Sequence, residues 1–261
     1  MNWVTFVGEG RSGHTIVSAI LGSHPHMRMG EEQKYISKFS RQDWTREQII
    51  EHNLDSGLGK ARKLLEFPNI LTHEEPLLAI GDKCGWDAVM EYRKRGAAPT
   101  LLTDFGAHMG MPVKTIVTLR HPLDNITNWV SSPKYIRMFS DEGLRYRRMI
   151  RRYKQFHDAA LDILVDQDIF YLHNEALIAD PYRTCMALAE WIGLPEDEEW
   201  ASDCASRVFT KPNQCRTEAE WPEEYVKRVT DYIDSCPLLE YYRCETLQRS
   251  LTTMRLARRT G

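Results

Sequence analysis

The sequence lacks long hydrophobic runs. No stretch of about 18 apolar residues occurs in its 261 residues, which argues against a membrane-spanning helix. The first expected strand begins within three residues of Met1 and leaves no room for a signal peptide, a transit peptide or a membrane anchor. We therefore expect a soluble protein in the cytoplasm.

Metal-binding cysteine motifs are also missing. The six cysteines form no Cys-x-x-Cys pair and have no histidine nearby at ligand spacing; they stand at positions 84, 185, 204, 215, 236 and 244. We expect reduced thiols and no bound metal.

The chain has no large excess of either charge. Its 34 basic and 37 acidic residues leave a net charge of −3, and the pI is near 6.3. This balance argues against a nucleic-acid partner or an anionic membrane surface, so any basic site must be local. No repeat, low-complexity segment or linker is visible, and 42% of the residues are hydrophobic. We expect one domain over residues 1–261, while the oligomeric state cannot be read from the sequence.

The most informative stretch is residues 4–15, where an apolar run meets a glycine-rich turn and then an apolar helix pattern. Glycines let the backbone approach an anion closely, and the dipole of the following helix favours negative charge there. The spacing of Gly8 and Gly13 matches the nucleotide phosphate loop, but His14 stands at the position of the usual lysine. Arg11 offers a positive fork in the same loop. We expect this loop to bind phosphate or sulfate without ordinary ATP or GTP hydrolysis.

A second segment has the same design. Residues 113–119 predict a buried strand that runs into Arg120, and Pro122 opens a helix through Val130. Parallel strands place their carboxyl ends on one edge of a sheet, so both loops can face one ligand. Two such loops indicate a ligand with two separated anionic groups.

Two further pairs of charged residues lie near expected strand ends. Glu31 and Glu32 follow an extended Met27–Met29 segment, in which alternation would aim only one of the two acids into the site. Asp82 and Lys83 follow a short strand expected at 77–80. Asp82 could act as a magnesium ligand, and Lys83 could supply the positive group that the first loop lacks.

The remaining pattern alternates strands with helices. Residues 34–75 predict a helical lid or substrate-facing insert, with a capping box at 45–48, and residues 196–261 predict a helical C-terminal part. The other expected elements are a strand at 168–172 and helices at 15–21, 87–95, 99–108, 122–130, 140–167 and 182–192.

Three segments together resemble the sulfotransferases that use 3′-phosphoadenosine 5′-phosphosulfate (PAPS). Residues 7–15 resemble the 5′-phosphosulfate loop of that family, and residues 114–124 resemble its 3′-phosphate strand-to-helix turn. Residues 174–181, continuing to 191–195, are similar to a third family segment and its helix end. The resemblance covers most of residues 1–215. It implies an α/β fold, a P-loop-type three-layer sandwich with a central parallel sheet and helices on both faces.

The resemblance also implies roles for particular residues. The run from Gly30 to Glu32 is closest to the tyrosylprotein and related bacterial type, in which the second glutamate is the proposed base. This places the base at Glu32, with Lys83 and Arg11 as the other catalytic residues. The cofactor-binding residues are expected to be Arg11, Ser12, Gly13, His14, Thr15, Arg120, Asn128 and Lys211.

Some positions depart from the family pattern. His14 replaces a threonine, Asn128 a serine, Asn174 a tyrosine near the adenine, and Cys84-Gly85 the usual dipeptide ending in proline. Asparagine can still donate to phosphate, and histidine can donate or, when protonated, carry charge. We expect PAPS binding to be retained, with PAP as product and no metal.

The expected function is transfer of a sulfuryl group from PAPS to a hydroxyl or amine of a small, natural-product-like acceptor. The alternatives are a P-loop kinase or NTPase that uses Thr15 and Asp82 around magnesium, and a nucleotide-binding protein without catalysis.

Overall fold

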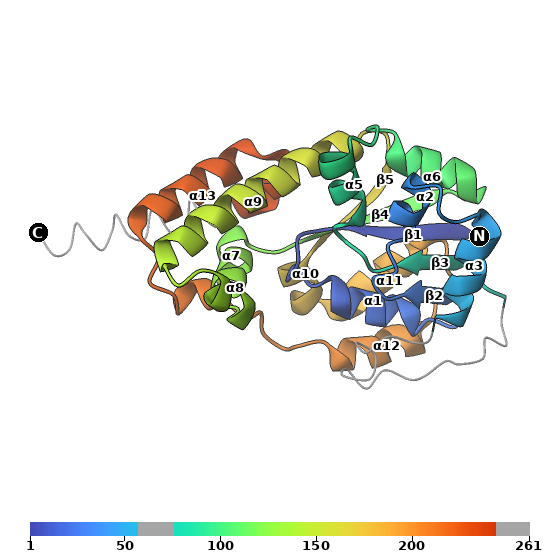
Figure 1. The fold of residues 1–261 in the computed structure, drawn as a ribbon. Helices are drawn as coiled ribbons and strands as arrows, with labels where there is room; N and C mark the ends of the chain where they lie inside the picture. Colours follow the sequence, from blue (N-terminus) through green and yellow to red (C-terminus); the bar gives the residue numbers. More distant parts are fainter. Residues whose placement is uncertain (57–75, 244–261) are drawn as a thin grey trace, which may run out of the picture. The chain divides into compact units, whose positions relative to one another are not determined.

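The computed structural model describes residues 1–56 and 76–243 (Figure 1). Contacts within the chain group its residues into two compact units. The first comprises Met1–Arg120 and Asp162–Pro212, and the second comprises His121–Leu161 and Asn213–Gly261. The expectation of a single domain over 1–261 stays a prediction.

The first unit is built on a sheet of five parallel strands in the order β2-β3-β1-β4-β5. The strands are β1 (Asn2–Val7), β2 (Met27–Gly30), β3 (Ala79–Asp82), β4 (Val113–Leu119) and β5 (Asp168–His173). β1 is fully buried beyond its first residue, as expected for a strand covered on both faces.

Helices cover both faces of this sheet (Figure 1). They are α1 (His14–Gly22), α2 (Tyr35–Ser40), α3 (Arg46–Asp55), α5 (Asp87–Arg95), α6 (Leu101–Met109), α10 (Asn174–Ala179), α11 (Pro181–Ile192) and α12 (Glu198–Arg207). Val4 and Phe6 share a hydrophobic core with α1, α11 and α12. Trp3, on the opposite face of β1, packs edge-on against Tyr35 of α2 and Phe105 of α6. The predicted three-layer α/β architecture is confirmed.

The strand order creates a switch point at the centre of the sheet. From β1 the chain continues through α1 to β2 at one edge, whereas the chain leaving β4 reaches β5 at the other edge. β1 and β4 are hydrogen-bonded neighbours, so their carboxyl ends lie side by side. Ligands of open parallel sheets bind outside the strand ends at such a point.

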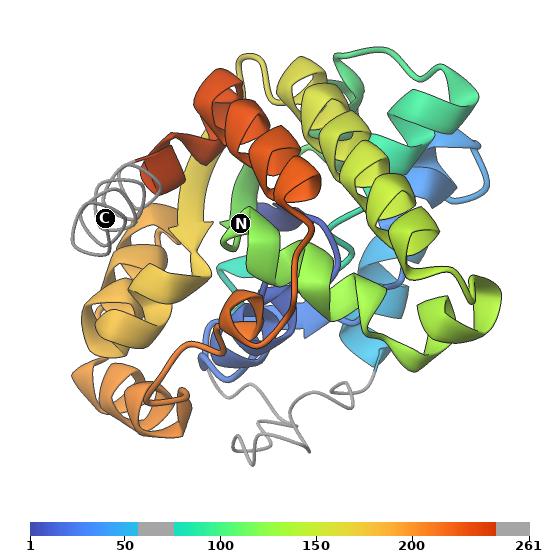
Figure 2. The ribbon, with the colours of Figure 1, turned by 90° about the vertical axis from the view of Figure 1, so that its left-hand side faces the viewer.

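The second unit is helical. It contains α7 (Pro122–Val130), α8 (Pro133–Met138), most of α9 (Glu142–Ile163), η1 (Cys215–Thr217), α13 (Glu223–Ser235) and η2 (Pro237–Tyr242). Both views show α9 and α13 side by side (Figures 1 and 2), and Tyr232 on α13 donates from its hydroxyl to the Lys154 carbonyl on α9, at 3.2 Å. Among residues 1–56 and 76–243, no helix combines the length and apolarity that crossing a bilayer would require.

Most expected elements are present with small shifts. The helix at 122–130 and the strand at 113–119 have the expected bounds, and Thr45 forms the expected capping box with Gln48. The strand expected at 77–80 instead ends at Asp82, because Gly81 and Asp82 continue the parallel register with β1. Helix α8 was not expected from the sequence. Part of the expected 34–75 insert forms α2 and α3, and the rest lies outside the described residues, as do the last residues of the expected C-terminal part.

Candidate functional site

The glycine-rich loop joins β1 to α1 at the switch point. The Gly8 amide donates to the Gly85 carbonyl at 2.8 Å, and a Cβ at Gly8 would lie 2.1 Å from Oγ1 of Thr118. Gly13 is the N-cap of α1 with φ of 103°, a conformation that side chains strongly disfavour. The first amides of a helix have no carbonyl one turn earlier to bond, so this loop presents donors suited to an anion.

The structure brings the second predicted anion-binding segment against the first. Arg120 follows β4 and donates from Nη1 to the Arg11 carbonyl at 3.4 Å. Ser12 Oγ lies 2.9 Å from Oγ1 of buried Thr118 on β4, two residues before Arg120. Arg11 has φ of 73°, an uncommon conformation for a residue with a side chain, and such strain occurs often at ligand-binding turns. Two guanidinium-bearing residues therefore belong to one edge of the sheet.

His14 is buried at the start of α1. Burial, together with the charge of Lys83, lowers the pKa of its imidazole to about 4. His14 is therefore neutral near pH 7 and acts as a hydrogen-bonding group, not as a substitute for the cationic lysine of nucleotide phosphate loops. Lys83 lies two residues before Gly85, whose carbonyl accepts the Gly8 amide at 2.8 Å, so the chain that carries Lys83 contacts the loop directly.

Lys83 is a buried cation that faces two acids. Its Nζ lies 3.1 Å from Oε1 of Glu31 and 3.7 Å from Oε1 of Glu32. The expectation that only one of the two acids would point toward the site is wrong, because β2 ends at Gly30 and Glu32 adopts φ of 55°. That turn breaks the alternation of an extended strand and brings both carboxylates to one ammonium. The side chain of Glu32 is 51% exposed and that of Glu31 is 22% exposed, so Glu32 is the more accessible acid.

Asp82 is engaged with the backbone. Its Oδ1 accepts from the Gln33 amide at 3.0 Å and its Oδ2 accepts from the Lys34 amide at 2.8 Å. Both oxygens are directed at the turn that follows β2. This arrangement favours a structural role for Asp82 over the role of a magnesium ligand at the phosphate loop.

Asn174 begins α10 and lies over the phosphate loop. A Cβ at Gly13 would lie 2.6 Å from Oδ1 of Asn174, so the amide side chain is packed onto the loop backbone. The preceding residue, His173, has its imidazole pKa lowered to about 4 by burial. The contact of Asn174 with the loop was not foreseen, nor was the bond from Ser12 to Thr118. The sequence feature that could have indicated Thr118 is a hydroxyl near the carboxyl end of the strand that precedes Arg120.

Three predicted cofactor residues lie apart from these contacts. Thr15 is exposed on the first turn of α1, and Lys211 is exposed on the segment after α12. Asn128 belongs to the second unit, where its Nδ2 donates to the Asp124 carbonyl and to Sγ of Cys215, each at 3.0 Å. Their roles toward a cofactor stay predictions.

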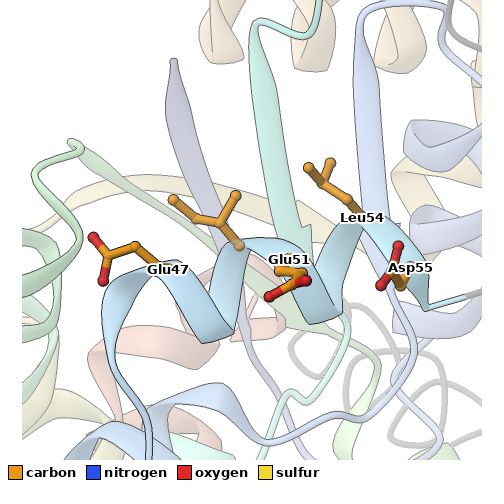
Figure 3. A pocket seen from close by; sticks show the side chains of 5 residues that line it. Glu47, Glu51, Leu54 and Asp55 are labelled. Atoms are coloured by element: carbon orange, nitrogen blue, oxygen red, sulfur yellow. The ribbon is translucent and has the colours of Figure 1, made fainter.

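A surface hollow of about 380 Å³ lies on α3, within the expected substrate-facing insert (Figure 3). It is lined by Glu47, Ile50, Glu51, Leu54 and Asp55. All five residues belong to one helix and none belongs to the strand-end loops, so the strand ends define the candidate site.

No protein-family model and no curated protein sequence matches this chain. Solved structures do resemble it. A sulfotransferase from Alicyclobacillus acidocaldarius is 13% identical, with a TM-score of 0.52 over 92% of this chain and 95% of that chain. The sulfotransferase domain from the curacin biosynthetic pathway is 15% identical, with a TM-score of 0.50 over 88% and 97% of the two chains. The sulfotransferase STF9 from Mycobacterium avium is 12% identical, with a TM-score of 0.51 over 89% and 76%. At these identities the likeness shows the fold, which this chain shares with the three proteins.

Proposed function

We propose that this chain, which has the sulfotransferase fold, moves the sulfuryl group of PAPS to a hydroxyl or amine of a small-molecule acceptor and releases PAP. The observation that carries the proposal is buried Lys83, whose ammonium faces Glu31 and Glu32 and which lies two residues before the Gly85 contact with Gly8. A cation for the leaving group and a base for the acceptor are thereby joined at adjacent strand ends.

The residues at the switch point suit a ligand with phosphates at both ends. The amides of Ser12 to Thr15 and the Arg11 side chain would hold the 5′-phosphate group, with Gly13 and neutral His14 in the same turn. Arg120 would hold the 3′-phosphate, and the family resemblance adds Asn128 and Lys211 as further candidates for phosphate binding. When bound, PAPS supplies an activated sulfuryl group on a phosphate leaving group.

Sulfuryl transfer depends on in-line positioning and on electrostatic stabilisation, as phosphoryl transfer does. Glu32 would accept the proton of the acceptor hydroxyl or amine as its oxygen or nitrogen bonds to sulfur. Lys83 and Arg11 would stabilise the bridging oxygen and phosphate of the leaving nucleotide, which would keep the electron pair of the broken sulfur–oxygen bond. The transferring sulfuryl bears less charge than a terminal phosphoryl, so these cations can take the place of a magnesium ion.

Two observations bear on the class of acceptor. One structure with this fold comes from the curacin biosynthetic pathway, which supports modification of a natural product. Glu31, Asp43 and Trp44 would suit a polar or cationic acceptor, whereas Tyr35 is fully buried. A cytoplasmic location stays a prediction.

The base is tested by the variant Glu32→Gln. Loss of a general base removes about 10²- to 10⁴-fold in rate, so turnover with saturating PAPS should fall in that range while the PAP-induced shift in melting temperature is retained. Glu31→Gln is the matched comparison, because it removes the charge of the adjacent acid that also faces Lys83, and we expect a smaller loss. Near-full turnover of Glu32→Gln, or a larger loss in Glu31→Gln, would contradict the assignment.

The reaction class is tested separately. Sulfate transfer that survives EDTA supports the proposal. ATP hydrolysis abolished by EDTA would point to a P-loop kinase or NTPase, and PAP binding with no transfer to a panel of acceptors would point to a non-catalytic nucleotide-binding protein.

A further inference from the structure

Asp82 is a buried acid that the proposed mechanism does not use. It is the last residue of β3, and it precedes Lys83, whose own amide donates to the Gly30 carbonyl at 3.1 Å. The Asp82 residue is 4% exposed, and its carboxylate accepts the amides of Gln33 and Lys34. An acid at the end of one strand therefore holds the turn that leaves the neighbouring strand.

That turn has an unusual backbone. Glu32 has φ of 55° and Lys34 has φ of 59°, although neither is glycine. Side chains disfavour this left-handed region, so such a conformation persists only where surrounding contacts impose it. Asp82 accepts two amides of this turn. One belongs to Lys34, which has positive φ, and the other belongs to Gln33, which lies between Glu32 and Lys34.

The surroundings of Asp82 make the two amide bonds important. Burial raises the pKa of its carboxyl to about 6, partly offset by the backbone amides, and the charge of Asp87 raises it further. The space beside it, lined with Trp3, Thr5, Tyr35, Ile36, Cys84 and Asp87, is too small for a water molecule. Two of the backbone hydrogen bonds of this carboxylate therefore come from the turn, and each satisfies a buried polar group.

We propose that Asp82 is a positioning residue for the base: by accepting the amides of Gln33 and Lys34 it holds the Glu31–Lys34 turn in the form that brings Glu32 to Lys83. This inference rests on the proposed function. It extends that function by proposing that Asp82 affects the rate of the reaction by holding Glu32 in place.

The test is the variant Asp82→Asn, which keeps the shape but replaces one accepting oxygen with a donor. We expect kcat to fall by about 10- to 100-fold, the size of effect that follows from misplacing a catalytic group by about 1 Å, with little change in PAP affinity. Asp87→Asn is the matched control. Asp87 is equally buried and accepts the Ser37 amide at 3.0 Å, but it does not contact the turn, so its variant should keep kcat within about twofold of the wild-type value.

A double-variant cycle separates positioning from general damage. If Asp82 acts through Glu32, the loss from Asp82→Asn should be largely absent in a Glu32→Gln background. Equal losses in both backgrounds, or an unchanged kcat for Asp82→Asn, would overturn the proposal.

Hydrogen exchange provides a readout that does not depend on activity. The amides of Gln33 and Lys34 should exchange faster in Asp82→Asn than in the wild type, and not in Asp87→Asn. If the wild type transfers no sulfate, the proposed function fails, and exchange still decides whether Asp82 holds the turn. Unchanged exchange at both amides would overturn the positioning role by itself.

Discussion

At the scale of single residues, His14 replaces the usual lysine of nucleotide phosphate loops without changing the backbone of the turn. The loop keeps the glycine conformation at Gly13 and the helix start that anion binding requires. The imidazole is buried and neutral, since its pKa is lowered to about 4. The positive charge near the loop is therefore carried by Arg11, Arg120 and Lys83.

This assignment predicts the effect of His14→Thr, which restores the residue typical of sulfotransferase loops. We expect PAP affinity to change by less than about tenfold, because a neutral hydrogen bond contributes about 0.5–1.5 kcal/mol. The ratio of wild-type to variant affinity should be the same at pH 7 and pH 8, since the pKa of His14 lies well below both values. Comparing the two proteins by calorimetry cancels the titration of PAP itself. A ratio that rises several-fold at pH 7 would show that His14 binds as a cation.

At the scale of elements, a buried ion pair fastens η1 to α7 within the second unit. The Arg216 guanidinium pairs with the Asp124 carboxylate, and the Arg216 amide donates to Oδ1 of Asp124 at 2.7 Å. Both side chains are almost fully buried, at 3% and 2% exposure. The same two elements meet where Asn128 contacts Cys215, so the predicted 3′-phosphate residue is positioned by this junction.

Removal of one partner from a buried pair leaves an uncompensated charge. We expect Asp124→Ala to lower the free energy of unfolding by about 3–5 kcal/mol, measured by urea denaturation. The exposed Lys227–Asp231 pair on α13, with Nζ to Oδ2 at 2.8 Å, provides the matched control. Asp231→Ala should change stability by less than about 1 kcal/mol, because exposed ion pairs contribute little. Similar effects from the two variants would show that the buried pair is not a stabilising junction.

At the scale of the whole molecule, histidines with a lowered pKa occur in both units. The pKa values of His14 and His173 in the first unit and of His157 in the second are all lowered to about 4, mainly by burial. In the unfolded chain these groups titrate near 6.5. Between pH 6.5 and pH 4 the unfolded chain therefore binds more protons than the folded one, so stability falls as the pH falls. Asp82, with its pKa raised to about 6, opposes this trend over part of the same range.

The prediction is a net loss of stability between pH 7 and pH 5. Fully buried His157 alone should contribute about 2 kcal/mol of that loss. His157→Gln should therefore flatten the pH dependence in urea denaturation series by about that amount, whatever its effect at pH 7. The variant of an exposed histidine, His108→Gln, is the control for the change of residue type. An unaltered slope in His157→Gln would contradict the buried neutral state.

The sequence by itself indicated the parallel α/β architecture and two loops at strand ends, whose binding of anions stays a prediction. These follow from local patterns: apolar strands, glycines at a turn, and Arg120 with Pro122 after the clearest strand. It also identified Lys83 and Glu32 as candidates, through a resemblance to a family. Their catalytic and cofactor roles stay predictions.

Tertiary structure alone decided how these groups meet. Burial set the charge state of His14, and the left-handed turn at Glu32 brought both acids to Lys83, against the simple alternation of a strand. The contacts of Asp82 with a turn 48 and 49 residues earlier, and of Asp124 with Arg216, join segments far apart in the chain. Such contacts depend on strand register and on long-range burial, which local sequence patterns do not encode.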